Sequence, residues 1–181
     1  SDGTTFKLAD ARGKPLELSF YPEDMTPGCT TESQDFRDLC AAFCKAQTEI
    51  LGISRDSLAS HVRFRDKEKL PFELLSDTDE KLCKLFDVIK EKNMYGKKVM
   101  GIERSTFLID AAGVLRHEWR KVKVAGHADD VLAAAKALWS RPAVSAPGDE
   151  AGFAWKATQD LYTSIWQLRA ELLYHLVPDR R

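Results

Sequence analysis

"LELSFYPEDMTPGCTTESQDF", residues 16–36, contains the corner on which the fold depends. In its first six residues, Leu-Glu-Leu-Ser-Phe-Tyr, apolar side chains alternate with polar ones, as is typical of a β-strand, and Pro22 ends that strand. From Thr30 to Lys45, apolar residues recur at helical spacing. We therefore predict a strand, a tight corner and a long helix, with Cys29 at the corner.

The following hundred residues alternate between strand and helix patterns. Strands are expected over 49–53, 72–75, 105–110 and 114–119, and helices from Leu58 onward, from Leu82 to Ile89 and over 127–138. This order is β-α-β-α-β-α-β-β-α. It predicts an α/β protein with a mixed central sheet flanked by helices on both faces, a layout that resembles the thioredoxin-like fold.

The composition changes after Trp139. We expect one domain over residues 1–139, a linker rich in Pro, Gly, Ala and Ser over 140–152, and an extra amphipathic C-terminal helix over 153–178. The apolar stripe of this helix is expected to pack on its own domain or on a partner subunit. Its polar face is mixed in charge, whereas a helix lying on a membrane surface favours a basic one.

Composition excludes several classes of function. The 181 residues carry 27 basic and 28 acidic side chains, a net charge of -1, so nucleic acid is not an expected partner. No apolar run approaches the roughly 18 residues that cross a bilayer, and no membrane partner is expected. Four cysteines are too few for a disulfide scaffold. Their helix-like, partly apolar contexts indicate a reducing compartment or a working thiol, and the cytoplasm is the default expectation.

The corner itself predicts a reactive thiol. If Thr26 is the N-cap, Pro27 takes the first helical position, where its missing N–H costs nothing, and Cys29 takes the third. The sulfur then faces the unpaired N–H groups of the first turn, where the helix dipole favours negative charge. The thiolate is the nucleophilic form of cysteine, so the corner predicts a nucleophile.

These residues resemble a known family. Pro22, Thr26 and Cys29 match the Pro-x-x-x-Thr-x-x-Cys signature of peroxiredoxins, and "FYPEDMTPGCTTE" is similar to its bacterioferritin comigratory protein, or Q-type, form. The similarity continues through "ILGISRDS", "LPFELLSD", "GIERSTFLID" and "KVKVAGHADDVL", and covers roughly residues 2–138. It implies a thioredoxin-like fold and thiol-dependent reduction of hydrogen peroxide and small alkyl hydroperoxides, without a cofactor or a metal.

The resemblance also implies site roles. Cys29 would be the peroxidatic cysteine, whose thiolate attacks the peroxide and becomes a sulfenic acid. Arg104 would stabilise the thiolate and the charge on the leaving oxygen. Thr26 would hydrogen-bond the peroxide, Pro22 would shield the site, and Glu32, one helical turn after Cys29, would orient the arginine.

The chain departs from the family in its recovery step. Gln34 and Arg65 occupy the two positions at which Q-type members carry a resolving cysteine. Cys40 and Cys44 share an apolar helix face and are expected in the core, with a metal site as a weaker reading. Cys83 is a possible resolving cysteine. The favoured alternative is reduction by an external thiol, from thioredoxin, glutaredoxin or a low-molecular-weight thiol, in a monomer or homodimer.

Two further departures concern the first strands. The strand region with which the family usually begins is expected to be missing ahead of residue 1, and Glu17 stands where a central strand normally carries an apolar residue. Since a buried carboxylate is costly unless paired, we expect Glu17 at an edge left open. The alternative function is a non-catalytic redox sensor or adaptor that binds a partner through the C-terminal helix.

Overall fold

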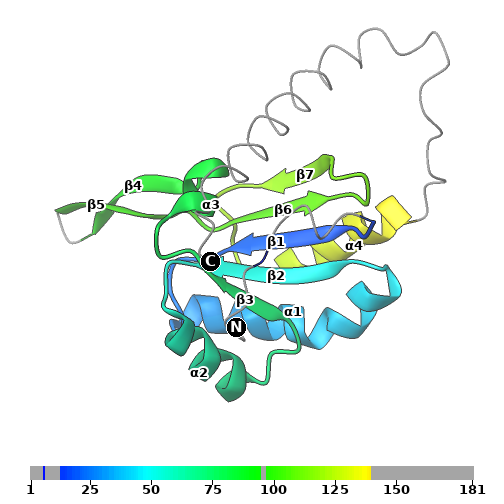
Figure 1. Cartoon of the computed structure of the whole chain (residues 1–181), viewed down its shortest axis with the longest axis horizontal. Helices are drawn as coiled ribbons and strands as arrows, with labels where there is room; N and C mark the ends of the chain where they lie inside the picture. The colour runs from blue at the N-terminus through cyan, green and yellow to red at the C-terminus, as the bar shows by residue number, and fades with distance from the viewer. Residues whose placement is uncertain (1–5, 7–12, 95–96, 140–181) are drawn as a thin grey trace, which may run out of the picture. The chain divides into compact units, whose positions relative to one another are not determined.

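The computed structural model describes residue 6, residues 13–94 and residues 97–139, and Figure 1 shows their arrangement. The elements in chain order are β1 Leu16–Phe20, α1 Pro27–Lys45, β2 Glu49–Ser54, α2 Leu58–Glu68, β3 Glu73–Ser76, α3 Lys81–Leu85, β4 Ile89–Met94, β5 Lys97–Ile102, β6 Ser105–Ile109, β7 Leu115–Trp119 and α4 His127–Trp139. The predicted linker (140–152) and C-terminal helix (153–178) lie outside the described residues. No described helix is long and apolar enough to span a membrane.

Strand β1 is the centre of a five-stranded sheet with the order β3-β2-β1-β6-β7. It pairs in parallel with β2 and antiparallel with β6, while β2–β3 is parallel and β6–β7 antiparallel. Parallel neighbours need a crossover, which α1 and α2 supply, and the β6–β7 pair closes through a short turn at Gly113 (φ 84°). The predicted mixed sheet and its β6–β7 hairpin are confirmed.

The sheet separates two cores because side chains along a strand point alternately to its two faces. Leu16, Leu18 and Phe20 of β1 pack into one cluster, whereas Tyr21, the residue directly after the strand, belongs to the other. We call the first cluster the hairpin-side core and the second the helix-side core. The hairpin-side core is built of Leu16, Leu18, Phe20, Leu51, Ile53, Cys83, Phe86, Val88, Ile102, Phe107 and Ile109.

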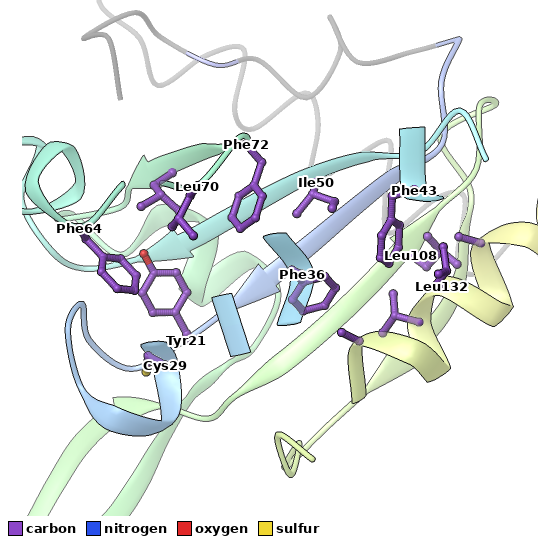
Figure 2. Close-up of a cluster of buried hydrophobic side chains, with 14 residues drawn as sticks. Tyr21, Cys29, Phe36, Phe43, Ile50, Phe64, Leu70, Phe72, Leu108 and Leu132 are labelled. Carbon is purple, nitrogen blue, oxygen red and sulfur yellow. The ribbon is translucent and has the colours of Figure 1, made fainter. Parts of the chain in front are cut away.

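The helix-side core lies between the sheet and helices α1, α2 and α4. Figure 2 shows Cys29 beside Tyr21 at one end of this cluster and Phe43 near Leu132 at the other. Phe36 and Phe43 face the sheet from α1 with ring centroids 5.7 Å apart. The short helix α3 packs on the opposite face, so the prediction of helices on both faces is confirmed.

The region after α3 corrects the sequence analysis. The helix predicted from Leu82 to Ile89 ends at Leu85, and Ile89 begins strand β4 of a two-stranded hairpin that was not expected. Asp87 has a positive φ of 52°, and the Val88 N–H returns to the Cys83 carbonyl, so the backbone leaves the helix there. The hairpin projects beyond the main sheet in Figure 1.

The expectation for Glu17 was wrong. Strand β1 is the central strand, and Glu17 is completely buried on its helix-side face. Its Oε1 accepts a hydrogen bond from Ser19, while its Oε2 is buried without a partner among the described residues. Paired strands on both sides of β1 leave no open edge, so this carboxyl group sits inside the core.

Candidate active site

The site is built where β1 turns into α1. After β1 the Tyr21 N–H still bonds to Ile53 O, and the chain then bends through Pro22 to Met25, whose φ is 59°. The Asp24 N–H donates to Asp56 Oδ2 over 2.9 Å, which ties this corner to the loop after β2. Helix α1 begins at Pro27 with Thr26 as N-cap, as predicted.

Cys29 occupies the third position of α1 and is only 1% exposed. Arg104 lies immediately before β6, and its Nη2 is 3.2 Å from the Cys29 sulfur. The Arg104 carbonyl accepts from the Val122 N–H, which holds this backbone in place. A guanidinium and the N-terminal end of a helix therefore converge on one sulfur, and both favour its thiolate.

Glu32 completes the group from the next turn of α1. It is buried, and its Oε2 accepts a hydrogen bond from Nη1 of Arg104. Burial raises the pKa of Glu32 to about 7, although the charge and hydrogen bond of Arg104 act in the opposite direction. Burial by itself would lower the pKa of Arg104, but the charges of Glu32 and Cys29 outweigh it and raise that pKa. Cys29, Arg104 and Glu32 thus form one contact group.

Thr26 and Pro22 lie in the segment that connects β1 to α1. Both are partly exposed, and the Thr26 hydroxyl donates to the Glu23 carbonyl instead of capping the helix. The lone pairs of this hydroxyl oxygen stay available to accept a hydrogen bond from another donor. The roles predicted for these two residues, binding and shielding of the peroxide, stay predictions.

The other three thiols lie in different surroundings. Cys83 is fully buried in the hairpin-side core, on the opposite face of the sheet from Cys29, and burial with the neighbouring Asp77 raises its pKa. Cys40 is half-buried against the helix-side core, as expected, but Cys44 is exposed, which corrects the prediction that both are core residues. All four cysteines are free thiols. Among the described residues, no group of His, Cys, Asp and Glu could hold a metal ion.

A buried polar cluster behind the corner escaped the sequence analysis. Asp24 Oδ2 lies 2.9 Å from Nδ1 of the fully buried His61, and the Tyr21 hydroxyl donates to Asp24 Oδ1 over 2.8 Å. The other ring nitrogen of His61 lies 3.2 Å from Leu75 O. The available signal was a histidine three residues before the buried Phe64 on α2, which places both on the inner face of that helix.

Asp24→Asn is expected to destabilise the fold in a pH-dependent way. Burial raises the pKa of Asp24, but hydrogen bonds from His61 and Tyr21 outweigh it and hold that pKa below its usual value. The stabilisation is therefore present above the unfolded pKa of about 3.9 and is lost as pH falls through the lower folded pKa. At pH 7 the variant should lose about 2 kcal/mol in urea unfolding, and less near pH 3.

Asp38 offers a matched control, because it is an exposed carboxylate on α1. Asp38→Asn should change the free energy of unfolding by less than about 0.5 kcal/mol. An Asp24→Asn effect that is equal at both pH values would contradict the role given to the carboxylate.

Comparison with known proteins agrees with this geometry. Residues 1–118 match the model of the AhpC/TSA family. The peroxiredoxin Bcp of Xanthomonas campestris is 59% identical over 137 residues, covering 76% of this chain and 86% of the relative. The peroxiredoxin Bcp of Bacillus subtilis is 54% identical over 130 residues, covering 72% of this chain and 83% of the relative. A solved structure of the Xanthomonas campestris bacterioferritin comigratory protein, described by its alkyl peroxide reduction activity, superposes with a TM-score of 0.74 at 57% identity, covering 77% of this chain and 89% of that one.

A thioredoxin-like sheet that carries a thiol at a helix start, held by an arginine, defines a peroxiredoxin. The chain belongs to the AhpC/TSA family, and within it to the Bcp, or Q-type, peroxiredoxins. The resemblance predicted from the signature at Pro22, Thr26 and Cys29 is confirmed.

Proposed function

We propose that this chain reduces hydrogen peroxide and small alkyl hydroperoxides at Cys29, with electrons from an external thiol. The observation that carries the proposal is the contact of the Cys29 sulfur with Arg104, 3.2 Å away, at the start of α1. The Arg104 guanidinium and the N-terminal end of α1 stabilise the thiolate before the peroxide arrives. The same guanidinium lies beside the negative charge that forms on the leaving oxygen.

In the first step the thiolate attacks the terminal oxygen of the peroxide. An S–O bond forms, the O–O bond breaks, and the sulfur is oxidised to a sulfenic acid while the peroxide is reduced to water or an alcohol, with one proton taken up. Arg104 stabilises the charge on the leaving oxygen. The Thr26 hydroxyl accepts from the peroxide O–H, and Pro22 limits access of water to the corner.

In the second step an outside thiol attacks the sulfur of the sulfenic acid and releases water. A second thiol then breaks the mixed disulfide, which restores Cys29 and leaves the reductant as a disulfide. The placement of the chain's own thiols supports this route. A disulfide needs Cα atoms within about 7 Å. Cys83 belongs to the core on the opposite sheet face, and Cys40 lies 11 residues along α1, about 16 Å away at 1.5 Å per residue.

The reductant is proposed to be thioredoxin, glutaredoxin or a low-molecular-weight thiol, and the oligomeric state a monomer or homodimer. The cytoplasm stays the expected compartment, since a recovery step of this kind depends on a supply of reduced thiols.

The test is turnover by a chain whose only thiol is Cys29. The variant C40A/C44S/C83A, like the wild type, should consume many equivalents of hydrogen peroxide per chain in excess dithiothreitol. Its rate should lie within about threefold of the wild type, since Cys83 belongs to the core on the other sheet face and Cys40 and Cys44 lie about three turns or more along α1 from Cys29. Mass spectrometry after one equivalent of peroxide without reductant should find the oxygen on Cys29.

Two results would contradict these proposals separately. Oxidation that stops after one equivalent in the wild type, whatever the reductant, would indicate a sensor and not a peroxidase. Turnover in the wild type that is lost in the triple variant, together with a Cys29–Cys83 disulfide in high yield, would establish an internal resolving cysteine instead.

A further inference from the structure

A series of hydrogen-bonded, buried polar side chains, which we call the polar chain, lies beneath the active site and takes no part in the two reaction steps proposed for Cys29. Ser19 of β1 donates to Glu17 and lies 3.5 Å from the hydroxyl of Thr106 on β6. The Thr106 hydroxyl is 2.8 Å from Nε2 of His127, the first residue of α4. Because Glu17 and Thr106 are fully buried, this polar chain lies within the helix-side core and away from solvent.

Two carboxyl groups in this region each have one unpartnered oxygen. Oε2 of Glu17 and Oε1 of Glu32 are buried, and they are the side-chain oxygens that lack a hydrogen-bond partner among the buried polar atoms of the described residues. Leaving a buried acceptor unpaired is costly, and for a charged group more so. One proton shared between the two groups would satisfy both oxygens at once.

The charges around Glu17 fix which group holds that proton. The charged group that acts on Glu17 itself is Glu32 of α1, while Arg104 and Asp35 act on Glu32. His127 of α4 is linked to Glu17 through Thr106 and Ser19. Burial raises the pKa of Glu17 well above its usual value, and the charge of Glu32 raises it further, against the hydrogen bond from Ser19.

The remaining neighbour of the polar chain, His127, does not supply a positive charge at neutral pH. Burial and the charge of Arg104 lower the pKa of His127 to about 4, against a smaller opposing effect from Asp130. Arg104 is therefore the cation of this group, and it is already bound to Glu32. No cation acts on Glu17 itself, so its burial and the charge of Glu32 both favour its protonated form.

We propose that Glu17 is a positioning residue of the peroxidase: as a neutral acid, it donates from Oε2 to the free Oε1 of Glu32, directly or through one bound water, and so fixes the carboxylate that aligns Arg104 on Cys29. This inference rests on the proposed function. It extends the group Cys29–Arg104–Glu32 by one residue on the central strand, and Ser19 holds the far oxygen of Glu17.

The arrangement predicts a specific pH dependence. When Glu17 loses its proton at alkaline pH, the donor to Glu32 disappears and two buried carboxylates repel each other. Arg104 is then shared between competing negative charges, and its alignment on the sulfur weakens. The rate of Cys29 oxidation in the wild type should therefore decline at alkaline pH, and a residue that cannot ionise at position 17 should remove that decline.

The test compares Glu17→Leu with Glu17→Gln in the full chain, with the rate of Cys29 oxidation by hydrogen peroxide measured across pH by stopped flow. Glu17→Leu removes the donor and should slow the reaction about tenfold at neutral pH. Glu17→Gln keeps an N–H donor for Glu32 and an oxygen for Ser19, so it should react within about twofold of the wild type and lack the alkaline decline.

Glu68→Gln is the matched control, because Glu68 is a buried carboxylate on α2 that binds Gln34 and has no contact with Arg104. Its pH profile should equal that of the wild type. If Glu17→Leu keeps the wild-type rate and profile, or if Glu17→Gln is as slow as Glu17→Leu, the positioning role is overturned.

Infrared spectroscopy tests the proton directly and does not depend on activity. Because the pKa of Glu32 is about 7, part of the Glu32 carboxyl groups is also protonated at neutral pH, so the test compares variants. The wild type should show a C=O stretch of a protonated carboxyl group that Glu17→Gln lacks and that Glu32→Gln keeps. A spectrum without this band overturns the inference. If the wild type fails to turn over peroxide, the proposed function fails, and the infrared band alone then decides whether Glu17 carries the proton.

Discussion

Cys29→Ser is expected to reduce peroxide consumption to the uncatalysed background, a loss of roughly four orders of magnitude or more. A serine hydroxyl does not ionise near neutral pH, even beside Arg104, and its oxygen cannot be oxidised as sulfur can. The fold should remain, because serine is close in size to cysteine and can hydrogen-bond the guanidinium. Peroxide consumption in excess dithiothreitol is the measurement, with circular dichroism as the check on folding.

Cys44→Ser is the matched control, since Cys44 lies on the same helix and is exposed. This variant should keep the wild-type rate and should still form a sulfenic acid that a carbon nucleophile can trap. A Cys29→Ser chain that retains more than a few per cent of the wild-type rate would rule out Cys29 as the nucleophile.

Arg104→Gln should lower the second-order rate of Cys29 oxidation by about 10²–10³, the usual cost of removing a positioned donor to a developing negative charge. The guanidinium contacts the sulfur with Nη2 and Glu32 with Nη1. A glutamine amide is uncharged, so it cannot replace the charged contact with the sulfur or the one with Glu32. Arg104→Lys should recover only part of the rate, because an ammonium is a point charge that cannot make both contacts in the same geometry.

Arg104→Gln should also destabilise the fold, because it leaves the Glu32 carboxylate buried without its cation. Breaking a buried pair in this way costs about 3–5 kcal/mol. The pKa of Glu32 is already raised, to about 7, above an unfolded value of about 4.3. Its protonated form therefore favours the folded state at low pH, and this contribution is lost as pH rises through the folded pKa. The loss of stability should be larger at pH 8 than at pH 5.

A second substitution separates the two effects. Arg104→Gln combined with Glu32→Gln removes the unpaired carboxylate and should recover most of the stability in urea unfolding, while the oxidation rate stays low. If the double variant recovered the rate as well, Arg104 would act by supporting the fold and not by stabilising charge at the sulfur.

The corner could be predicted from the sequence because its determinants are local. Pro22 ends the strand, Thr26 and Pro27 start the helix, and the position of Cys29 in the first turn follows from counting. The contact of Arg104 with Cys29 joins residues 75 positions apart, and only the family resemblance pointed to it. Its partner Glu32 was predicted on the same basis, and the structure brings all three side chains together.

Residues whose surroundings come from distant segments were predicted less well. Glu17 was expected at an edge, since a single sequence gives no information on which strands flank β1. The β4–β5 hairpin was missed because Ile89, which begins β4, continues the helical spacing of Leu82 and Leu85. The backbone leaves the helix through a positive φ at Asp87, and no glycine stands there to indicate that conformation in the sequence. Cys44 follows the apolar spacing of α1, but at this point of the helix the neighbouring Phe43 takes the fully buried inward position and Cys44 is left exposed.

The two cores that the sheet separates also sort the thiols by chemistry. Cys29 and Cys83 are equally hidden from solvent, yet one has a guanidinium beside its sulfur and the other a carboxylate, Asp77. An oxidant small enough to enter the protein would therefore find one sulfur activated and the other suppressed. If Cys29 is the single oxidation site, as proposed, the charges on either side of the sheet account for that selectivity without a difference in accessibility.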